Sequence, residues 1–421
     1  MDASGAAQFG SLLREARKRK GLSQSALGGD TYSGSYISHL ESGRRAATPE
    51  VIEFLSHRLG VSSLEWGVAP AADPARLFSG TTIEDLLVAE RAWSEHDWAS
   101  AMEHAKRAAA AAAANGDAGR HWEALYVLAQ AQFSSGDFVA AAQLGEELAE
   151  HETARELAVA RAQALSLASV ANRASDRLGW AIAFSARAVE AASSAPPIIL
   201  AEALMALVSA LSEAGHSFTE SEPYLNRLRE LSPRLTSDHS RGLIAWALGT
   251  AYFFGGDSEE GLRQHGIAQE LLDPRRDLRL WLRFSSAAAH WRLNIGMIEG
   301  VPELVRTAAL GLQILGNSHD VVELRKVEAM LALRTGAPEG AVRILTGVLD
   351  DPVLGGPGIS LGGVRLILGH ALAALDRQEA ARAEFATAAL QFEEEGRLLS
   401  AVDAWRLSAG QKSSTEFLTR G

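Results

Sequence analysis

The sequence predicts an all-α protein: a five-helix N-terminal domain, then a right-handed solenoid of about eight helical pairs with a C-terminal capping helix. Short polar or glycine-containing breaks recur every forty residues, and Ala/Leu-rich helical stretches lie on both sides of each break. A period of this length is typical of stacked helical pairs. Only 12 prolines occur among 421 residues, which leaves room for long helices. The period starts near Thr81, so the preceding residues must form a different unit.

The breaks define the repeat unit. Eight of them can be placed in register, centred on His96, Gly136, Asp176, His216, Gly256, Gly296, Gly336 and Asp376. A residue that is small in all but one unit stands seven positions before each break, or eight in the fourth unit, at Ala89, Ala129, Ser169, Val208, Gly249, Ala289, Ala329 and Gly369. Small side chains at a helix crossing allow the two axes to approach closely. We therefore expect each pair to cross near this position.

One unit carries a recognisable pattern. The segment Trp246–Phe253 and the later Ala268 resemble the tetratricopeptide repeat, although the period of forty exceeds the usual length of about 34 residues. The resemblance implies stacked helical pairs and says little about any partner. We expect one domain over residues 8–66, a proline-containing linker over 67–80, and the solenoid over 81–421, ending in a helix over Leu398–Phe417.

Composition restricts the function. The chain has no cysteine, which excludes disulfides and thiolate metal sites, and its 12 histidines show no metal-ligand spacing. No nucleophile–base arrangement or phosphate loop is evident, so we expect neither an enzyme nor a cofactor. We also find no signal peptide or membrane span, and expect a cytoplasmic protein. Residues 1–66 carry a net charge of +1 and the remainder −13, so any contact with nucleic acid is expected at the N-terminal domain.

The N-terminal domain contains a series of short helices. Caps and stops predict helices over Gln8–Lys20, Gln24–Leu27, Gly34–Ser42, Pro49–Leu59 and Gly60–Trp66. Ser23 and Ser33 are the expected N-caps of the second and third helices. A glycine-rich turn over residues 28–32 separates these two helices.

The strings LLREARKRKGLSQSAL, SGSYISHLESGRR and PEVIEFLSHRLGVS resemble the Cro/phage-repressor (XRE) type of helix-turn-helix domain over about 60 residues. The matches at Leu22-Ser23-Gln24, Tyr36-Ile37-Ser38 and Leu40-Glu41-Ser42-Gly43 lie in register. The second helix and its turn are about one residue shorter than usual, which leaves the angle of the third helix open. An alternative is that this fold serves protein contact.

The resemblance implies which residues contact DNA. The third helix of such domains enters the major groove, so Gly34, Ser35, Ser38 and His39 are the expected base-facing residues. Gln24 and Ser33 lie at helix N-termini suited to phosphate. Arg44 and Arg45 follow the third helix and are expected to bind the DNA backbone, and Tyr36 is expected to contact a thymine methyl or sugar.

The solenoid offers a second candidate site. Projected onto tetratricopeptide geometry, the first helices of the pairs place a column of aromatic, amide and cationic residues on the concave groove, suited to an extended peptide. The predicted ligand-binding residues are Tyr126, Gln130, Arg173, Trp246, Thr250, Arg283 and His290, with Phe133, Gln163, Ser166, Phe253, Lys326 and His370 in the same column. The alternative for each residue is packing between repeats or plain solvated surface.

The domain order is similar to that of the peptide-pheromone-sensing regulators of Gram-positive bacteria. This resemblance implies a transcription regulator that binds an inverted-repeat DNA operator as a homodimer and whose groove binds a peptide or protein ligand. Two alternatives lack a small ligand: a DNA-tethered interaction scaffold and an antitoxin-like repressor. A ligand receptor should have a deep, closed groove, and a scaffold an open, shallow one.

Overall fold

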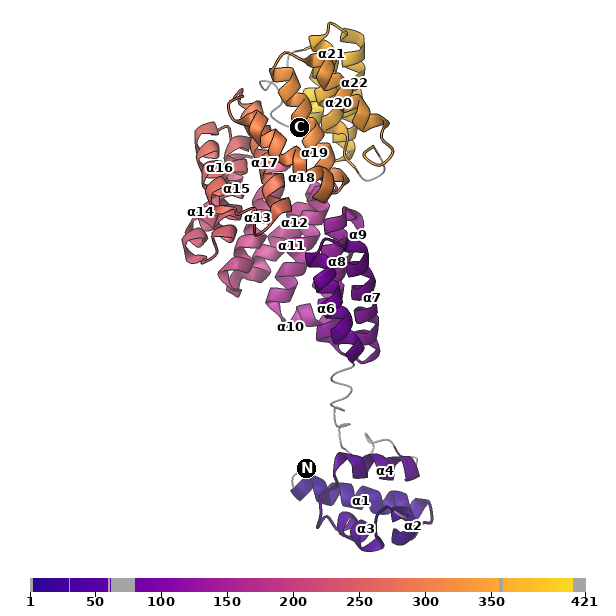
Figure 1. The fold of residues 1–421 in the computed structure, drawn as a ribbon. Helices are drawn as coiled ribbons and strands as arrows, with labels where there is room; N and C mark the ends of the chain where they lie inside the picture. The colour runs from indigo at the N-terminus through magenta and orange to yellow at the C-terminus, as the bar shows by residue number, and fades with distance from the viewer. Residues whose placement is uncertain (1–2, 30, 60, 62–79, 356–358, 412–421) are drawn as a thin grey trace. The chain divides into compact units, whose positions relative to one another are not determined.

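The computed structural model describes residues 3–29, 31–59, 61, 80–355 and 359–411 (Figure 1). The chain divides into two compact units, Met1–Gly80 and Thr81–Gly421, which we describe separately. Within the described ranges both units contain helices and no strands. The expected helix over Gly60–Trp66, apart from Val61, and nearly all of the linker lie outside the described residues. The expected C-terminal helix over Leu398–Phe417 ends instead at Ser408, because the chain turns at Gly410 in the left-handed conformation, and residues 412–417 lie outside the described ranges.

The N-terminal unit contains four described helices: α1 Ala3–Arg19, α2 Gln24–Gly28, α3 Gly34–Glu41 and α4 Pro49–Leu59. Helix α1 begins five residues earlier than the sequence pattern predicts. A single apolar core joins the four helices and includes Phe9, Leu13, Leu27, Ile37, Leu40 and Leu55, each at most 1% exposed.

Local chemistry determines where α2 and α3 begin. Both predicted N-caps are present: the Ser23 hydroxyl accepts a hydrogen bond from the Ala26 amide, and the Ser33 hydroxyl from the Tyr36 amide. Helices α1 and α3 approach closely at Gly10, where an added Cβ would lie 2.4 Å from the Leu40 carbonyl oxygen. Glycine is therefore required at this crossing.

The described part of the second unit contains eight helical pairs followed by one further α-helix (Figure 1). The first helices of the pairs are α6 Gly80–Ser94, α8 Ala118–Ser135, α11 Ala158–Ala174, α13 Pro197–Glu213, α15 Asp238–Phe254, α17 Leu278–Asn294, α19 Ser318–Arg334 and α21 Gly362–Ala374. The second helices are α7 Trp98–Ala114, α9 Phe138–Glu150, α12 Leu178–Ala191, α14 Phe218–Leu231, α16 Ser258–Leu271, α18 Val301–Leu315, α20 Pro338–Asp350 and α22 Gln378–Glu394. Two α-helices of the described residues stand outside this scheme, the short α10 Glu152–Glu156 and the final α23 Leu398–Ser408, as do the 3-10 turns η2 Ala192–Ser194 and η3 Ser232–Arg234.

The same backbone conformation recurs at each break of the forty-residue period. In every pair the first helix ends at a residue in the left-handed conformation, with φ between 55° and 99°. At the second pair this residue is Gly136, and the next amide, of Asp137, donates to the Gln132 carbonyl at 2.9 Å. Such six-to-one hydrogen bonds satisfy the last free carbonyls of a helix. Seven breaks are confirmed at the predicted residue, but the fourth lies at Gly215 and not at His216, because glycine adopts this conformation without a Cβ clash.

The small residues before each break lie where the two helices of a pair cross. Ala89, Ala129, Ala289 and Ala329 have no exposed surface. At Gly249 an added Cβ would lie 2.4 Å from the His265 ring on α16, and at Gly369 it would lie 2.5 Å from the Phe385 ring on α22. The predicted close approach of paired helices is therefore present.

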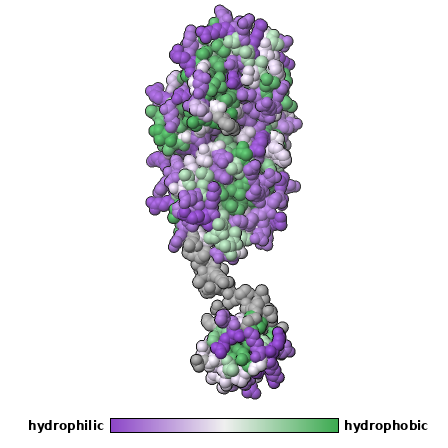
Figure 2. All heavy atoms as spheres, turned by 90° about the vertical axis from the view of Figure 1, so that its right-hand side faces the viewer, coloured by the Kyte–Doolittle hydropathy of each residue, from purple (hydrophilic) through white to green (hydrophobic). Residues whose placement is uncertain are grey.

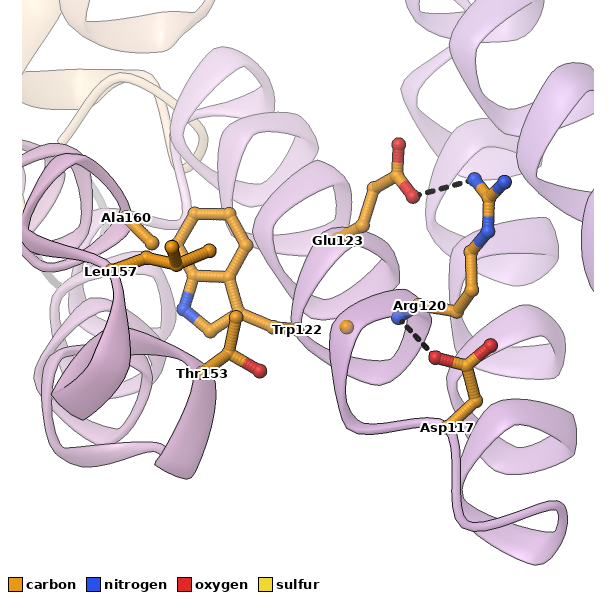
Figure 3. Close-up of a pocket in the computed structure, with 8 residues that line it drawn as sticks. Asp117, Arg120, Trp122, Glu123, Thr153, Leu157 and Ala160 are labelled. Atoms are coloured by element: carbon orange, nitrogen blue, oxygen red, sulfur yellow. Dashed lines mark hydrogen bonds and ion pairs between the residues drawn. The ribbon is translucent and has the colours of Figure 1, made fainter. Parts of the chain in front are cut away.

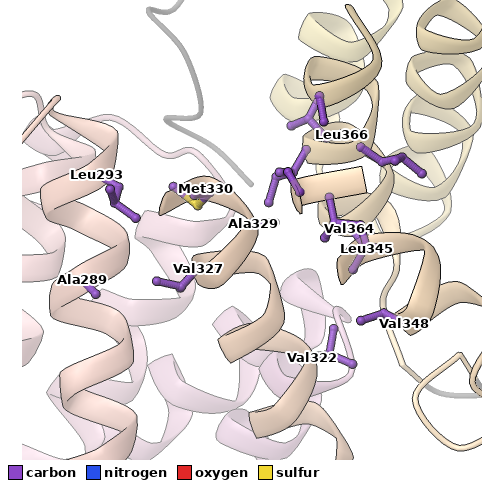
Figure 4. Packing of buried hydrophobic residues seen from close by; sticks show 14 of the residues in the cluster. Ala289, Leu293, Val322, Val327, Ala329, Met330, Leu345, Val348, Val364 and Leu366 are labelled. Atoms are coloured by element: carbon purple, nitrogen blue, oxygen red, sulfur yellow. The ribbon is translucent and has the colours of Figure 1, made fainter. Parts of the chain in front are cut away.

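Buried apolar clusters lie between successive pairs, and the two largest span Trp122–Tyr252 and Ala245–Ala404. Figure 4 shows part of the second, with Leu293 on α17 on the same side as Val327 and Met330 on α19, and with Leu345 on α20 beside Val364 on α21. These side chains are fully buried, and each pair covers an apolar face of the next. Stacking of neighbouring pairs is thus the main source of solenoid stability.

The solenoid also makes contacts between pairs that are distant in sequence. The Arg279 guanidinium on α17 donates to the Ser134 carbonyl of α8 at 2.8 Å, and its Cζ lies 5.9 Å from the Trp98 ring centroid. Asn317 also donates to Ser134, at 3.5 Å. We call the set Trp98, Ser134, Arg279, Asn317 and Asp320 the inter-turn contact. It shows that the stacked pairs complete a superhelical turn between the second and seventh pairs.

The solenoid surface is mixed in polarity. Figure 2 shows apolar patches between polar residues on one face. Exposed apolar side chains include Leu310 and Ile314 on α18 and Trp180 on α12. In the described part of the chain, no helix combines the length and apolar character needed to cross a bilayer.

Candidate nucleic-acid interface and interior charged cluster

Helix α3 has a buried face and a solvent face. Ile37 and Leu40 are fully buried, whereas Ser35 and His39 are exposed and Ser38 is half-buried. Positions 35, 38 and 39 follow i, i+3, i+4 spacing and therefore share one helical face. The three predicted base-facing side chains thus lie together on the accessible side of α3.

Glu41 connects α3 to the two preceding helices. Its carboxylate accepts hydrogen bonds from Arg17 at 2.5 and 2.9 Å and from the Gln24 amide at 2.9 Å. Burial opposes ionisation, but the hydrogen bonds from Arg17 and Gln24, together with the Arg17 charge, hold the pKa of Glu41 below its usual range. This buried, charge-assisted network sets the angle of α3 against α1 and α2.

Two predicted DNA-contacting residues also have structural contacts. The Gln24 side chain donates to Glu41, so one of its two amide hydrogens is already used within the domain. At Gly34 an added Cβ would lie 2.6 Å from the Ser25 hydroxyl oxygen, so the absence of a side chain lets α3 start close against α2. The predicted DNA contacts of both residues remain predictions.

The residues that follow α3 present two cations. The amides of Arg44 and Arg45 both donate to the His39 carbonyl, at 3.0 and 3.3 Å, which orders the turn at the end of the helix. Both side chains are exposed. The Arg45 guanidinium lies over the Tyr36 ring, 4.8 Å from its centroid.

In the solenoid, three of the seven predicted ligand-binding residues belong to one network, which we call the interior charged cluster. Arg173 pairs with Glu213 at 2.5 Å and Arg283 pairs with Asp320 at 3.1 Å. Each of the two arginines also lies within electrostatic range of the other. The full cluster consists of Arg173, Asp176, Glu213, Arg283, His290, Asp320, Glu323, Lys326, Glu395 and Arg397.

Asp320 lies at the centre of one half of this cluster. It is the third residue of α19 and exchanges hydrogen bonds with the Asn317 N-cap in a capping box. Burial opposes ionisation, but Arg283 and Arg279 outweigh it and hold the pKa of Asp320 below its usual range. Arg283 keeps 37% of its side chain accessible, so it can bind Asp320 and still reach solvent.

His290 lies in the other half. Its Nε2 lies 2.9 Å from the side-chain amide nitrogen of Asn294. Burial, reinforced by the positive charge of Lys326, lowers the pKa of His290 to about 4. Burial opposes ionisation of Glu323, but Lys326 and His319 outweigh it and lower its pKa to about 2. A neutral imidazole therefore faces an ion pair between Lys326 and Glu323.

The remaining predicted ligand residues lie in other surroundings. Tyr126 stacks on Trp122 at 5.0 Å, and burial together with the Glu202 charge raises its pKa. Gln130 is half-buried one turn further along α8. Trp246 packs on Phe284, and the Thr250 hydroxyl lies 3.4 Å from His265, so both residues also contribute to packing between helices.

An open depression of about 440 Å³ lies outside the predicted column. Figure 3 shows the Trp122 indole facing Thr153, Leu157 and Ala160 on one side, while Asp117, Arg120 and Glu123 form the other. The Trp122 ring nitrogen donates to the Leu148 carbonyl at 3.1 Å. The forty-residue pattern did not predict this site, because it gives no indication of the short helix α10 that supplies Thr153.

Comparisons with known proteins bear on both units, and the sequence comparison concerns the N-terminal one. The sequence pattern of the helix-turn-helix domain matches residues 8–65. The N-terminal unit is a helix-turn-helix domain. No curated protein matches the chain.

Solved structures provide a comparison over most of the chain. The crystal structure of a Rap protein complexed with competence and sporulation factor aligns with 96% of this chain and 97% of that chain, at 12% identity and a TM-score of 0.52. The structure of Bacillus thuringiensis PlcR with the peptide PapR7 and DNA covers 77% and 99%, at 11% identity and a TM-score of 0.32. The solenoid that follows the helix-turn-helix domain therefore has the repeat fold of the Rap protein.

Several residues of the interior charged cluster could not be predicted from the sequence. Asp176, Glu213 and Arg397 come from the third pair, the fourth pair and the start of α23, and they meet only because the superhelix completes a turn. No local motif indicates these contacts. Within the described residues, no group of three metal-ligating side chains is close enough to hold an ion.

Proposed function

We propose that this protein is a sequence-specific transcription regulator. Its helix-turn-helix domain binds an inverted-repeat operator, while its solenoid dimerises and binds a peptide that modulates operator binding. The observation that carries the proposal is the combination of a helix-turn-helix domain with a Rap-like repeat fold in one chain.

The geometry of α3 supports DNA binding. Ser35, Ser38 and His39 share its solvent face, and the Glu41 network holds the helix against α1 and α2. Because the exposed side chains are small apart from His39, DNA shape and bridging water contribute to sequence preference. Arg44 and Arg45 supply the phosphate contacts.

The interior charged cluster supports ligand binding. Arg283 and Arg173 are partly accessible, and both are paired with carboxylates that a ligand's own carboxylate can replace. The Rap protein of the same fold was crystallised with competence and sporulation factor. In this chain the ligand is expected to be a short peptide that places a carboxylate at Arg283.

Dimerisation is expected because a single helix-turn-helix domain binds DNA weakly. One small helix-turn-helix domain makes few base contacts, and two linked domains gain affinity from their shared tether. Exposed apolar side chains such as Leu310 and Ile314 on α18 supply surface of the kind found in protein interfaces.

Selection of random duplex DNA by the purified full-length protein tests the proposal. We expect enrichment of an inverted repeat whose half-sites lie a whole number of helical turns apart, bound by two chains as judged by light scattering. Recovery of an asymmetric site bound by one chain would contradict it. A peptide ligand is then sought by its effect on the dissociation constant of the selected operator.

The scaffold alternative retains one supporting observation. The depression beside Trp122 is open to solvent and lies outside the predicted ligand column. An open, partly apolar surface suits a protein partner better than a small molecule. Copurification of a stoichiometric partner that binds without changing operator affinity would favour this function.

A further inference from the structure

The helix-turn-helix domain contains a row of stacked side chains that its sequence pattern did not predict. The Tyr32 and Tyr36 rings are nearly parallel, with centroids 5.2 Å apart, and Tyr32 meets Phe54 edge-on at 5.1 Å. An arginine lies at each end: Arg45 over Tyr36 at 4.8 Å, and Arg58 over Phe54 at 5.6 Å. The row links the turn, α3 and α4.

One end of the row is anchored to the backbone. The Arg58 guanidinium donates to the Ala26 carbonyl at 3.1 Å and packs against Gly29, where an added Cβ would lie 2.6 Å from its Nη1. Phe54 and Tyr32 are therefore held against the turn between α2 and α3. The Tyr36 ring therefore stacks on the ring of Tyr32, whose position is fixed.

At the other end of the row, the Arg45 guanidinium is available to bind an anionic ligand. Among the described residues, Arg45 forms no ion pair, and its contact is the ring of Tyr36. Arg44, its neighbour in sequence, has neither a ring nor a carboxylate partner in the described part of the chain. The two cations that follow α3 thus differ: one is pre-ordered by stacking and the other is not.

We infer that Tyr36 is a positioning residue that holds the Arg45 guanidinium beside α3 for contact with a DNA phosphate. The inference rests on the proposed DNA binding. Tyr32 and Arg45 both lie against the Tyr36 ring, so the partners of the ring belong to the domain itself. Stacking orders the arginine before DNA arrives, and less conformational entropy is lost on binding.

A double-mutant cycle tests this inference. The full-length protein carries Tyr36→Ala, Arg45→Ala or both, and binding is measured on the selected operator and on a random duplex. Tyr36→Ala is expected to weaken both complexes by roughly two- to fivefold, the range of an exposed cation–π contact. In the Arg45→Ala background the same change should have no further effect, because the residue it positions is gone.

Three further measurements separate positioning from other roles. Tyr36→Phe should bind like the wild type, since the ring is retained. Tyr36→Ala should reduce the slope of log affinity against log salt by up to about 0.9, as Arg45→Ala does. In the Arg44→Ala background, Tyr36→Ala should keep its full effect.

Additive losses from Tyr36→Ala and Arg45→Ala would overturn the inference, as would a loss in Tyr36→Phe equal to that in Tyr36→Ala. A changed base preference in Tyr36→Ala would show that Tyr36 reads DNA directly. If the wild type prefers no sequence, the proposed function fails. The cycle on the random duplex still decides the role of Tyr36, because phosphate contact does not depend on sequence.

Discussion

Arg279 and Asp320 are joined by two hydrogen bonds, of 3.0 and 2.7 Å from Nε and Nη2 to Oδ2, although 41 residues separate them. Both side chains are largely buried, with 13% and 3% exposed. The remaining guanidinium nitrogen of Arg279 reaches the Ser134 carbonyl at the end of α8. One side chain therefore connects the second, sixth and seventh helical pairs.

Removing this side chain should destabilise the solenoid. Arg279→Ala removes the shorter of the two side-chain hydrogen bonds to the Ser134 carbonyl and leaves the longer one, from Asn317. It also leaves Asp320 with Arg283 as its nearest remaining cation. Loss of one partner from a buried ion pair typically costs about 3 kcal/mol in the free energy of unfolding. Urea unfolding, followed by circular dichroism, measures this loss in the free energy of unfolding. Arg275→Ala is the matched control, since Arg275 is exposed and pairs with Asp273. Equal midpoints for the two variants would contradict the prediction.

Two glycines on α16 should respond in opposite directions to the same change. At Gly261 an added Cβ would lie 2.9 Å from the Phe253 ring, whereas at Gly266 it would meet no atom within 4 Å. Gly261→Ala should lose roughly 1–3 kcal/mol through overpacking. Gly266→Ala should gain roughly 0.5–1 kcal/mol, because alanine loses less backbone entropy in a helix. Thermal unfolding of both variants checks the pair, and a shared sign would show that the crossing of α15 and α16 is wrong.

Glu395 should make the solenoid less stable as pH rises. Burial and the Asp176 charge raise its pKa to about 7, and Ser360 donates to its Oε1 at 2.7 Å. The unfolded chain loses this proton near pH 4.3, so the stabilising contribution falls between about pH 4.3 and 7. Above pH 7 the folded state carries an enclosed carboxylate.

Glu395→Gln, which carries no charge, therefore should melt higher than the wild type at pH 8 and close to it at pH 4.5. The exposed neighbour Glu394, changed to glutamine, is the control. His290 and His370 have lowered pKa values that favour the folded state at high pH, but they are common to all variants and cancel in the comparison. A difference between wild type and Glu395→Gln that does not grow from pH 4.5 to 8 would refute the assignment.

In the helix-turn-helix domain, different residues should control the overall affinity for DNA and the preference for one sequence. Replacing Arg44 and Arg45 by alanine should weaken all duplexes about equally and reduce the salt slope by roughly 0.9 for each lost phosphate contact. Changing Ser35 or His39 should instead alter which sequence is bound. Fluorescence anisotropy at several salt concentrations measures both effects. The roles would be reversed if the arginine variant changed preference and kept its affinity.

Arg283→Ala should abolish the response to a peptide ligand while leaving ligand-free operator binding intact. Asp320 keeps its hydrogen bonds from Arg279 in this variant, so the fold should survive. Operator affinity is titrated with and without peptide, and thermal unfolding confirms the fold. Arg306→Ala, an exposed change on α18, serves as the control. A normal ligand response in Arg283→Ala would remove the interior charged cluster from the proposed mechanism.

The helices and the repeat could be predicted because they depend on neighbouring residues. Ser23 and Ser33 cap their helices through contacts three residues away, and left-handed breaks need only glycine, aspartate or histidine at one position. The shift of the fourth break from His216 to Gly215 follows the same rule. Burial of the small residues at each crossing follows from the period itself.

The interior charged cluster and the inter-turn contact could not be predicted. Arg279 and Asn317 reach Ser134 across 145 and 183 residues of chain. Whether such groups meet depends on the small rotation between successive pairs, summed over four or five of them, and no local pattern encodes this sum. In the same way, the bond between Gln24 and Glu41 depends on how three helices pack.

The inter-turn contact has a consequence for how this chain can evolve. Open solenoids tolerate duplication or deletion of whole repeats, since each repeat meets only its neighbours. Here a forty-residue duplication between α9 and α17 would displace Arg279 from Ser134 by one entire pair. Homologues that retain both residues are therefore expected to keep the same number of repeats between them, and changes in repeat number are expected outside this interval.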